Sequence, residues 1–144
     1  MFEKSIGIVP IKEDCENSNK ILYFIIQHKN GFHFGFPKGH QNENESYLQT
    51  ATRELREETN LEIEKVINEK DPIKEHYTCV KKDENIEKDV FYFLAFVKGE
   101  IKLDENEIIF GSWMSYEEAF DKITFDQSKN ILKKAHNIIK NENI

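Results

Sequence analysis

Three glutamates in one short stretch have the types and spacing that could do chemistry. Glu54, Glu57 and Glu58 are separated by three and four positions within residues 39–61. On a helix this spacing places the three carboxylates on one face, where like charges repel each other. A hard cation such as Mg²⁺ or Mn²⁺ prefers carboxylate oxygens and would relieve that repulsion. Taken alone, the spacing favours an ordinary solvated acidic face, so the surrounding residues must decide between the two interpretations.

The segment around these glutamates predicts a helix with both ends marked. Ser46 and Gln49 have the spacing of a capping box. Asn60 falls where a left-handed residue commonly ends a helix. We expect the glutamates to lie on the far side of the helix from its buried face, which is predicted to consist of Leu48, Ala51, Thr52 and Leu55.

Strands are predicted on both sides of this helix. A charged hairpin loop is expected at 81–88, a short helix from 115, and an amphipathic helix over 126–140. This order predicts an α/β fold in which a mixed sheet packs between helices as a single domain over 1–144. β-branched and apolar runs place the strands at 4–11, 20–27, 61–67, 73–80, 89–97 and 110–114, with an extended segment at 32–36 continuing to 40.

Composition narrows the class of protein. No apolar run approaches the length of a membrane span and no signal peptide is recognised, so a cytoplasmic protein without a membrane partner is expected. The formal net charge of −7 argues against a stable nucleic-acid partner, which requires a basic face. It does not exclude a phosphate-bearing substrate, because a bound metal reverses the local field. A monomer is favoured.

Two rare residue types carry weaker signals. The sequence has two arginines, Arg53 and Arg56, and both lie inside the acidic stretch. This placement suggests a need for the planar guanidinium fork, although two residues can also cluster by chance. Cys15 and Cys79 show no zinc-binding spacing, and we expect both to be reduced, packed thiols.

The spacing of fixed residues from Gly39 to Leu61 resembles the Nudix box of the Nudix hydrolase family. Gly39 is followed by five residues and Glu45, then by seven residues and the run from Arg53 to Glu58. One position departs from the box, because Asn60 stands where the family has glycine, and both residue types tolerate positive φ. The resemblance implies an α/β/α sandwich and the hydrolysis of a diphosphate linked to another moiety, with Mg²⁺ or Mn²⁺.

Roles for individual residues follow from this resemblance. Glu54, Glu57 and Glu58 match the metal ligands of the family, and the Gly39 carbonyl often supplies another. Arg53 matches the arginine that pairs with the first glutamate of the box, here Glu45. Such a site neutralises the phosphate charge and orients an in-line attack by water, whose proton a nearby carboxylate accepts. Glu54 is a candidate for that base. Glu107 is an alternative base or ligand, or a solvated loop charge.

A closer resemblance is to one subgroup, the asymmetrical bis(5'-nucleosyl)-tetraphosphatases, which split diadenosine tetraphosphate (Ap4A) into ATP and AMP. Residues 36–40 (FPKGH) and 88–95 are similar to segments of that subgroup. The resemblance implies that Tyr92 stacks on adenine and that Lys38, His40 and Lys88 face the phosphates. Tyr77 is a second candidate for base contact. His28, His33, His76 and His136 are interpreted as surface or packed residues.

Two alternatives stay open. The same chemistry serves a pyrophosphohydrolase of nucleoside triphosphates or of 5'-triphosphate RNA ends, although the negative charge weighs against long RNA. A Nudix fold can also act as a nucleotide-sensing module without catalysis. Such modules usually lose carboxylates of the box, and all three glutamates are present here.

Overall fold

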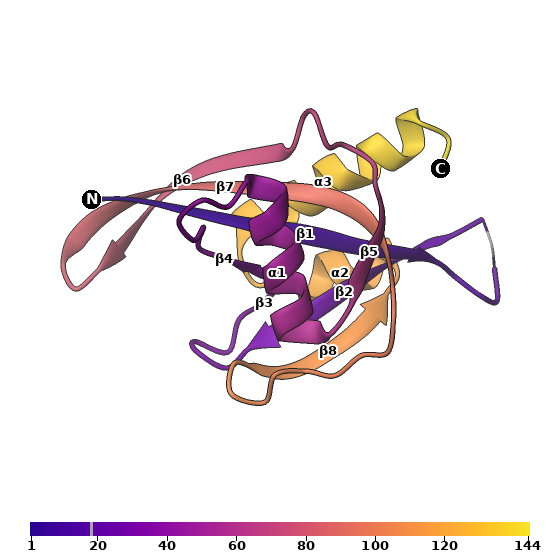
Figure 1. The fold of residues 1–144 in the computed structure, drawn as a ribbon, viewed down its shortest axis with the longest axis horizontal. Coiled ribbons are helices and arrows are strands. Elements are labelled where there is room, and N and C mark those ends of the chain that lie inside the picture. Colours follow the sequence, from indigo (N-terminus) through magenta and orange to yellow (C-terminus); the bar gives the residue numbers. More distant parts are fainter. Residues whose placement is uncertain (18) are drawn as a thin grey trace.

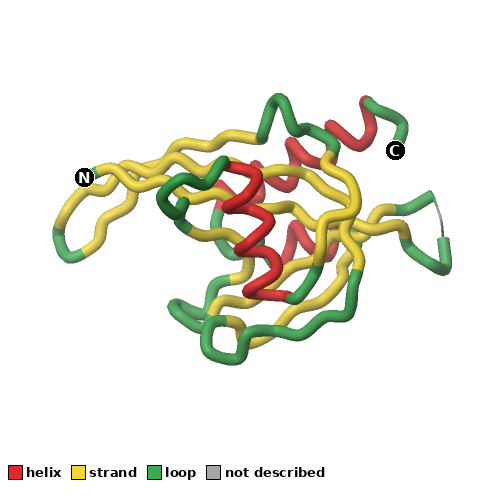
Figure 2. Tube along the Cα trace, viewed as in Figure 1, coloured by secondary structure: helices red, strands yellow, loops and turns green. Residues whose placement is uncertain are grey.

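A mixed sheet lies between two helical layers in the computed structural model, which describes residues 1–17 and 19–144 (Figures 1 and 2). Helix α1 (Tyr47–Thr59) covers one face of the sheet, while α2 (Tyr116–Lys122) and α3 (Asp126–Asn141) cover the other. This arrangement confirms the α/β/α sandwich. The strands are β1 (Phe2–Glu13), β2 (Ile21–His28), β3 (Phe34–Gly35), β4 (Lys38–Gly39), β5 (Glu62–Val66), β6 (Ile73–Lys81), β7 (Glu84–Lys98) and β8 (Ile108–Met114).

The long strands β1 and β7 form the centre of the sheet. They pair in parallel, from Phe2 with Glu87 to Ile11 with Phe96. The main order is β3-β2-β1-β7-β5, with β4 paired to β1, β6 to β7 and β8 to β2. These other pairings are antiparallel. The sheet is therefore mixed, as the sequence predicted.

Each face of the sheet has its own apolar core. In β1, Ile6 and Ile8 pack with α1, whereas Val9 and Ile11 belong to the cluster under α2 and α3. Side chains alternate between the faces of a strand, so a strand of this kind must be apolar on both sides. Leu55 anchors α1 to the first cluster and Leu132 anchors α3 to the second. The sheet thus fixes α1 relative to the opposite helical layer.

Helix α1 begins and ends where the sequence predicted. Ser46 caps its first turn in a capping box with Gln49, and Asn60 adopts φ 68° in the left-handed region. The glycine position of the box is thus filled by a residue that tolerates this conformation. The predicted buried face was wrong in part. Thr52 is exposed and Leu48 half-buried, whereas Glu58 is 3% exposed. The helix is rotated so that one glutamate points into the protein.

The hairpin between β6 and β7 is longer and tighter than predicted. Instead of a loop over residues 81–88, the strands continue to Lys81 and from Glu84, joined by Lys82 and Asp83 with φ of 50° and 64°. The result is a two-stranded arm that extends beside the N-terminus (Figure 1). Both cysteines are free, but Cys15 is exposed rather than packed.

Candidate active site

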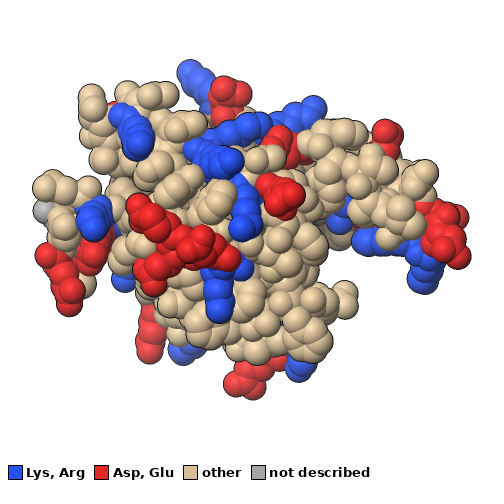
Figure 3. Space-filling model, turned by 180° about the vertical axis from the view of Figure 1, so that it is seen from behind, with Lys and Arg blue, Asp and Glu red and all other residues tan. Residues whose placement is uncertain are grey.

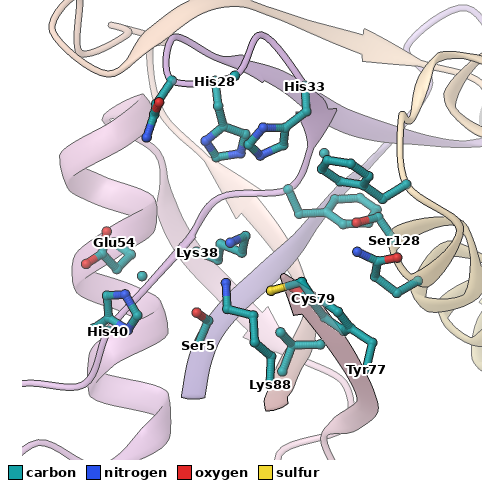
Figure 4. Close-up of a pocket in the computed structure, with 18 of the residues that line it drawn as sticks. Ser5, His28, His33, Lys38, His40, Glu54, Tyr77, Cys79, Lys88 and Ser128 are labelled. Atoms are coloured by element: carbon teal, nitrogen blue, oxygen red, sulfur yellow. The ribbon is translucent and has the colours of Figure 1, made fainter. Parts of the chain in front are cut away.

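Most residues predicted for the site line one cavity. It has a volume of about 1110 Å³ and lies between α1, the β6–β7 hairpin and the start of α3. Glu54 and His40 stand on one side and Lys88 and Tyr77 on the other, with Lys38 between them (Figure 4). The predicted residues in its wall are Lys38, Gly39, His40, Glu54, Glu58, Tyr77, Lys88, Tyr92 and Glu107.

Two carboxylates from consecutive turns of α1 form the acidic end of the cavity. Burial, followed by the charge of Glu54, raises the pKa of Glu58 to about 8. A hydrogen bond of 3.0 Å from the backbone N–H of Lys38 to Glu58 Oε1 partly opposes that rise. Burial also raises the pKa of Glu54 against the effect of Arg53. The protein therefore holds two carboxylates where their ionised forms are disfavoured.

Glu54 lies directly against the backbone of β4. A methyl group on Gly39 would overlap its carboxylate, so another residue there would displace Glu54. This close approach explains the glycine, since the φ of Gly39 is not in the left-handed region. The first glycine of the box therefore leaves room for a carboxylate beside a backbone carbonyl.

Glu57 is not in the cavity wall. Its side chain is 56% exposed and its Oε1 lies 3.3 Å from Arg53 Nη1. Arg53 holds Glu45 with two nitrogens, Nε to Oε2 at 2.8 Å and Nη2 to Oε1 at 3.1 Å, and also donates to Glu54 Oε1 at 2.9 Å. The hydrogen bonds from Arg53 lower the pKa of Glu45 to about 2. Arg53 also donates to the carbonyl of His40 at 2.9 Å, so one guanidinium ties the loop to the helix.

The acidic end suits a divalent cation, although it is not arranged as a complete ligand set. Among the side chains that the structure describes, no three His, Cys, Asp or Glu residues are grouped to hold a metal ion. Glu54 and Glu58 come together, while Glu57 is turned toward Arg53. Burial raises the pKa of both carboxylates, and a cation would supply the opposite charge that favours their ionised forms. Their hard oxygen donors fit Mg²⁺ or Mn²⁺.

The opposite end of the cavity carries positive charge. Lys38, Lys81 and Lys88 line it, and Lys81 was not predicted. Burial and the charge of Lys88 lower the pKa of Lys38. Ammonium groups this close together favour an anionic ligand. The cavity thus pairs an acidic end with a basic end.

The two tyrosines differ in their access to a ligand. Tyr92 is 2% exposed and packs edge-on against Phe36, with ring centroids 5.7 Å apart. The protein covers its ring almost completely, which argues against stacking of Tyr92 on adenine. Tyr77 is half-buried and in register with Lys88 across the hairpin. Tyr77 is therefore the better placed of the two for contact with a base.

Further wall residues come from loops. Glu107 is exposed beside the acidic end, and its charge contributes to the raised pKa of Glu58. His28 and His33, interpreted from sequence as surface or packed residues, line the cavity as a stacked pair with ring centroids 4.4 Å apart. Burial lowers the pKa of His28 to about 4, so this imidazole is neutral. The sequence signal for this stacked pair was a histidine on each side of the predicted turn.

The face of the molecule opposite to the view of Figure 1 shows mixed charge. Lys and Arg side chains are interspersed with Asp and Glu over the face drawn in Figure 3. No helix in residues 1–17 and 19–144 has the length and hydropathy needed to cross a membrane.

The comparison with known proteins identifies the class. A family model described as NUDIX domain matches residues 1–135, and the chain belongs to the Nudix family. It is a hydrolase that acts on phosphoric anhydrides.

Its relatives include one kind of Nudix enzyme in particular. The asymmetrical bis(5'-nucleosyl)-tetraphosphatase of Rattus norvegicus is 31% identical over 128 residues, which are 85% of this chain and 84% of the rat protein. The protein of the same name from Mus musculus is 32% identical over equal shares. The structure of a C. elegans Ap4A hydrolase binary complex has a TM-score of 0.74 at 20% identity, covering 96% of this chain and 98% of that chain.

Proposed function

We propose that this protein hydrolyses nucleoside polyphosphates with Mg²⁺ or Mn²⁺, and that its main reaction is the asymmetric cleavage of Ap4A to ATP and AMP. The observation that carries the proposal is the cavity with buried carboxylates at one end and lysines at the other. The substrate follows from relatives named asymmetrical bis(5'-nucleosyl)-tetraphosphatase at 31% and 32% identity. A cavity of about 1110 Å³ suits a nucleotide ligand.

The carboxylates of Glu54 and Glu58, with the carbonyl of Gly39, would hold the cation, and Glu57 would join them if it left Arg53. A cation held there supplies charge neutralisation for the phosphate chain and orientation for the attacking water. Lys38 and Lys88 bind phosphate oxygens from the other side as point charges. His40 faces the same space from the rim. Tyr77 offers a ring to an adenine base.

Proton transfer falls to a carboxylate of the acidic end. Water attacks one phosphorus, its oxygen forms the new P–O bond, and the bridging P–O bond breaks as the other product leaves. Glu54 accepts the proton of that water. Its carboxylate lies in the cavity wall beside Gly39, as proton transfer from a water in the cavity requires. Glu107 lies on the rim of the same space and is the alternative base.

Product analysis tests the proposal. Purified protein is incubated with Ap4A and Mg²⁺, and the nucleotides are separated over time. Equal amounts of ATP and AMP are expected, and a Glu54→Gln variant should lose that activity. ADP as the sole product, or no turnover, would refute asymmetric cleavage. Rates on oxidised dGTP and on a short 5'-triphosphate RNA, measured side by side, decide between Ap4A and the alternative substrates.

A further inference from the structure

A glutamate from the first strand stands among the lysines of the cavity. Glu3 in β1 is in register with Lys88 in β7, and Lys88 is in register with Tyr77 in β6. Cross-strand neighbours project from the same face of a sheet, so Glu3 lies on the face from which Lys88 and Tyr77 line the cavity. Glu3 Oε2 lies 3.5 Å from Lys88 Nζ and 3.6 Å from Lys81 Nζ. One carboxylate oxygen therefore bridges two ammonium groups.

This bridge has a clear electrostatic reason. The side chain of Lys88 is 11% exposed, and a buried ammonium group requires an anionic partner. Lys81 and Lys88 both contribute to lowering the pKa of Lys38, after its burial, whereas Glu3 acts in the opposite direction. Glu3 thus compensates the repulsion among lysines that face one space. A phosphate group placed between Lys81 and Lys88 would make the same contacts with more charge.

We propose that Lys81 and Lys88 form a distal phosphate site, and that Glu3 is a specificity-determining residue that occupies this site until a polyphosphate displaces it. Displacement replaces one ion-pair partner by another, so Glu3 subtracts a fixed amount from the affinity of every phosphate ligand that reaches the site. A phosphate chain too short to reach Lys81 and Lys88 does not bear this cost. Glu3 thereby lowers the affinity of long phosphate chains and leaves that of short ones unchanged. The inference rests on the proposed function for its substrate class.

Glu3 lies at the lysine end, where its ion-pair partners are Lys81 and Lys88. Its removal should therefore change KM for polyphosphate substrates and leave kcat unchanged. A merely structural role would instead lower stability and weaken binding, because Lys81 and Lys88 would lose the partner that positions them.

Binding of inorganic tripolyphosphate tests the inference without turnover. Wild type, Glu3→Gln and the control Glu13→Gln are titrated by calorimetry in buffer with EDTA. Glu13 is exposed at the other end of β1, so the control removes the same charge away from the cavity. Glu3→Gln should bind tripolyphosphate about twofold to fivefold more tightly, the range of one partly exposed ion pair. Glu13→Gln should match wild type.

Two further measurements decide the outcome. Pyrophosphate should gain less affinity from Glu3→Gln than tripolyphosphate does, and Lys81→Gln, on the exposed arm, should weaken tripolyphosphate binding at least threefold. Unchanged or weaker binding by Glu3→Gln would overturn the proposal, as would an equal gain in Glu13→Gln. If Glu3→Gln does not fold, Lys81→Gln decides the outcome. A tripolyphosphate affinity of Lys81→Gln equal to that of wild type would then overturn the proposal. Product analysis could refute Ap4A as the substrate while Glu3→Gln still binds tripolyphosphate more tightly. In that case the proposed substrate would be wrong and the distal phosphate site would still be supported.

Discussion

The two ends of the cavity are built in different ways. The acidic end comes from consecutive turns of α1 and the loop before it, so its residues are close in sequence. The lysine end comes from Lys38, the β6–β7 hairpin and the N-terminal strand, which only the sheet brings together. The carboxylates proposed for catalysis therefore come from one short segment of the chain. The residues proposed for substrate recognition come together only through the register of distant strands.

The largest effect is expected at the acidic end. Glu54→Gln removes the candidate base and should lower kcat by about 10²–10⁴-fold, the usual contribution of a general base. KM should change little, since the lysine end is untouched. Steady-state kinetics with Ap4A measures both constants, with the exposed Glu64→Gln as control. If Glu107→Gln caused the large loss and Glu54→Gln did not, the base would lie on the loop.

Glu58→Gln should make the metal-free protein more stable at high pH. The folded protein favours neutral Glu58, with a pKa of about 8, so folding binds protons between the ordinary pKa and that value. The unfolding free energy of wild type therefore falls as pH rises through this range. Glu58→Gln lacks this dependence and should be on the order of 2–4 kcal/mol more stable above pH 8. The advantage should vanish at low pH.

Urea unfolding in EDTA between pH 4.5 and 8.5 measures this difference, and Glu64→Gln should follow wild type throughout. A Glu58→Gln protein that is less stable than wild type at pH 8 would show that the acidic end holds no repulsion for a cation to relieve.

At the lysine end, the expected effect is on affinity. Tyr77→Leu should raise KM for Ap4A by about 5–100-fold, because stacking of a base on an aromatic ring contributes about 1–3 kcal/mol. Tyr92→Phe keeps a buried ring and should leave KM unchanged. Kinetics on both variants compares them directly. A raised KM in Tyr92→Phe with a normal Tyr77→Leu would instead indicate that the substrate contacts the hydroxyl of Tyr92.

The smallest effect concerns how the acidic end is assembled. Arg53→Lys loses the bidentate contact with Glu45 and should lower the unfolding free energy by about 1–2 kcal/mol. The other arginine supplies the matched control. Arg56 is 63% exposed and pairs with Glu62, so Arg56→Lys should change stability by no more than about 0.5 kcal/mol. Equal losses in the two variants would mean that the guanidinium fork has no special role in the clamp.

This comparison also explains what could be predicted from the sequence. The capping box at Ser46, the left-handed Asn60 and the spacing of the glutamates are local signals, and the structure has the helix they predict. The rotation of the helix about its axis was harder to predict, because the predicted buried face assumed that charged side chains stay in solvent. Glu58 breaks that assumption through its contact with the backbone of Lys38.

The lysine end was harder to predict for a physical reason. Tyr92 lies in an apolar strand that is buried on both faces, so alternation could not reveal that its ring packs on Phe36. The contact of Glu3 with Lys81 depends on the register of β1, β6 and β7 together. The charged residues 81–88 predicted a loop, whereas Lys82 and Asp83 alone make the turn. No local pattern carries that information.

The narrow turn of the β6–β7 arm bears on how the cavity can be reshaped. Insertions or deletions at Lys82 and Asp83 would lengthen or shorten the two paired strands. They would leave α1 and its carboxylates in place. Each such change alters one wall of the cavity alone. A change in the length of this one hairpin would therefore reshape the lysine end of the cavity and leave the acidic end unaltered.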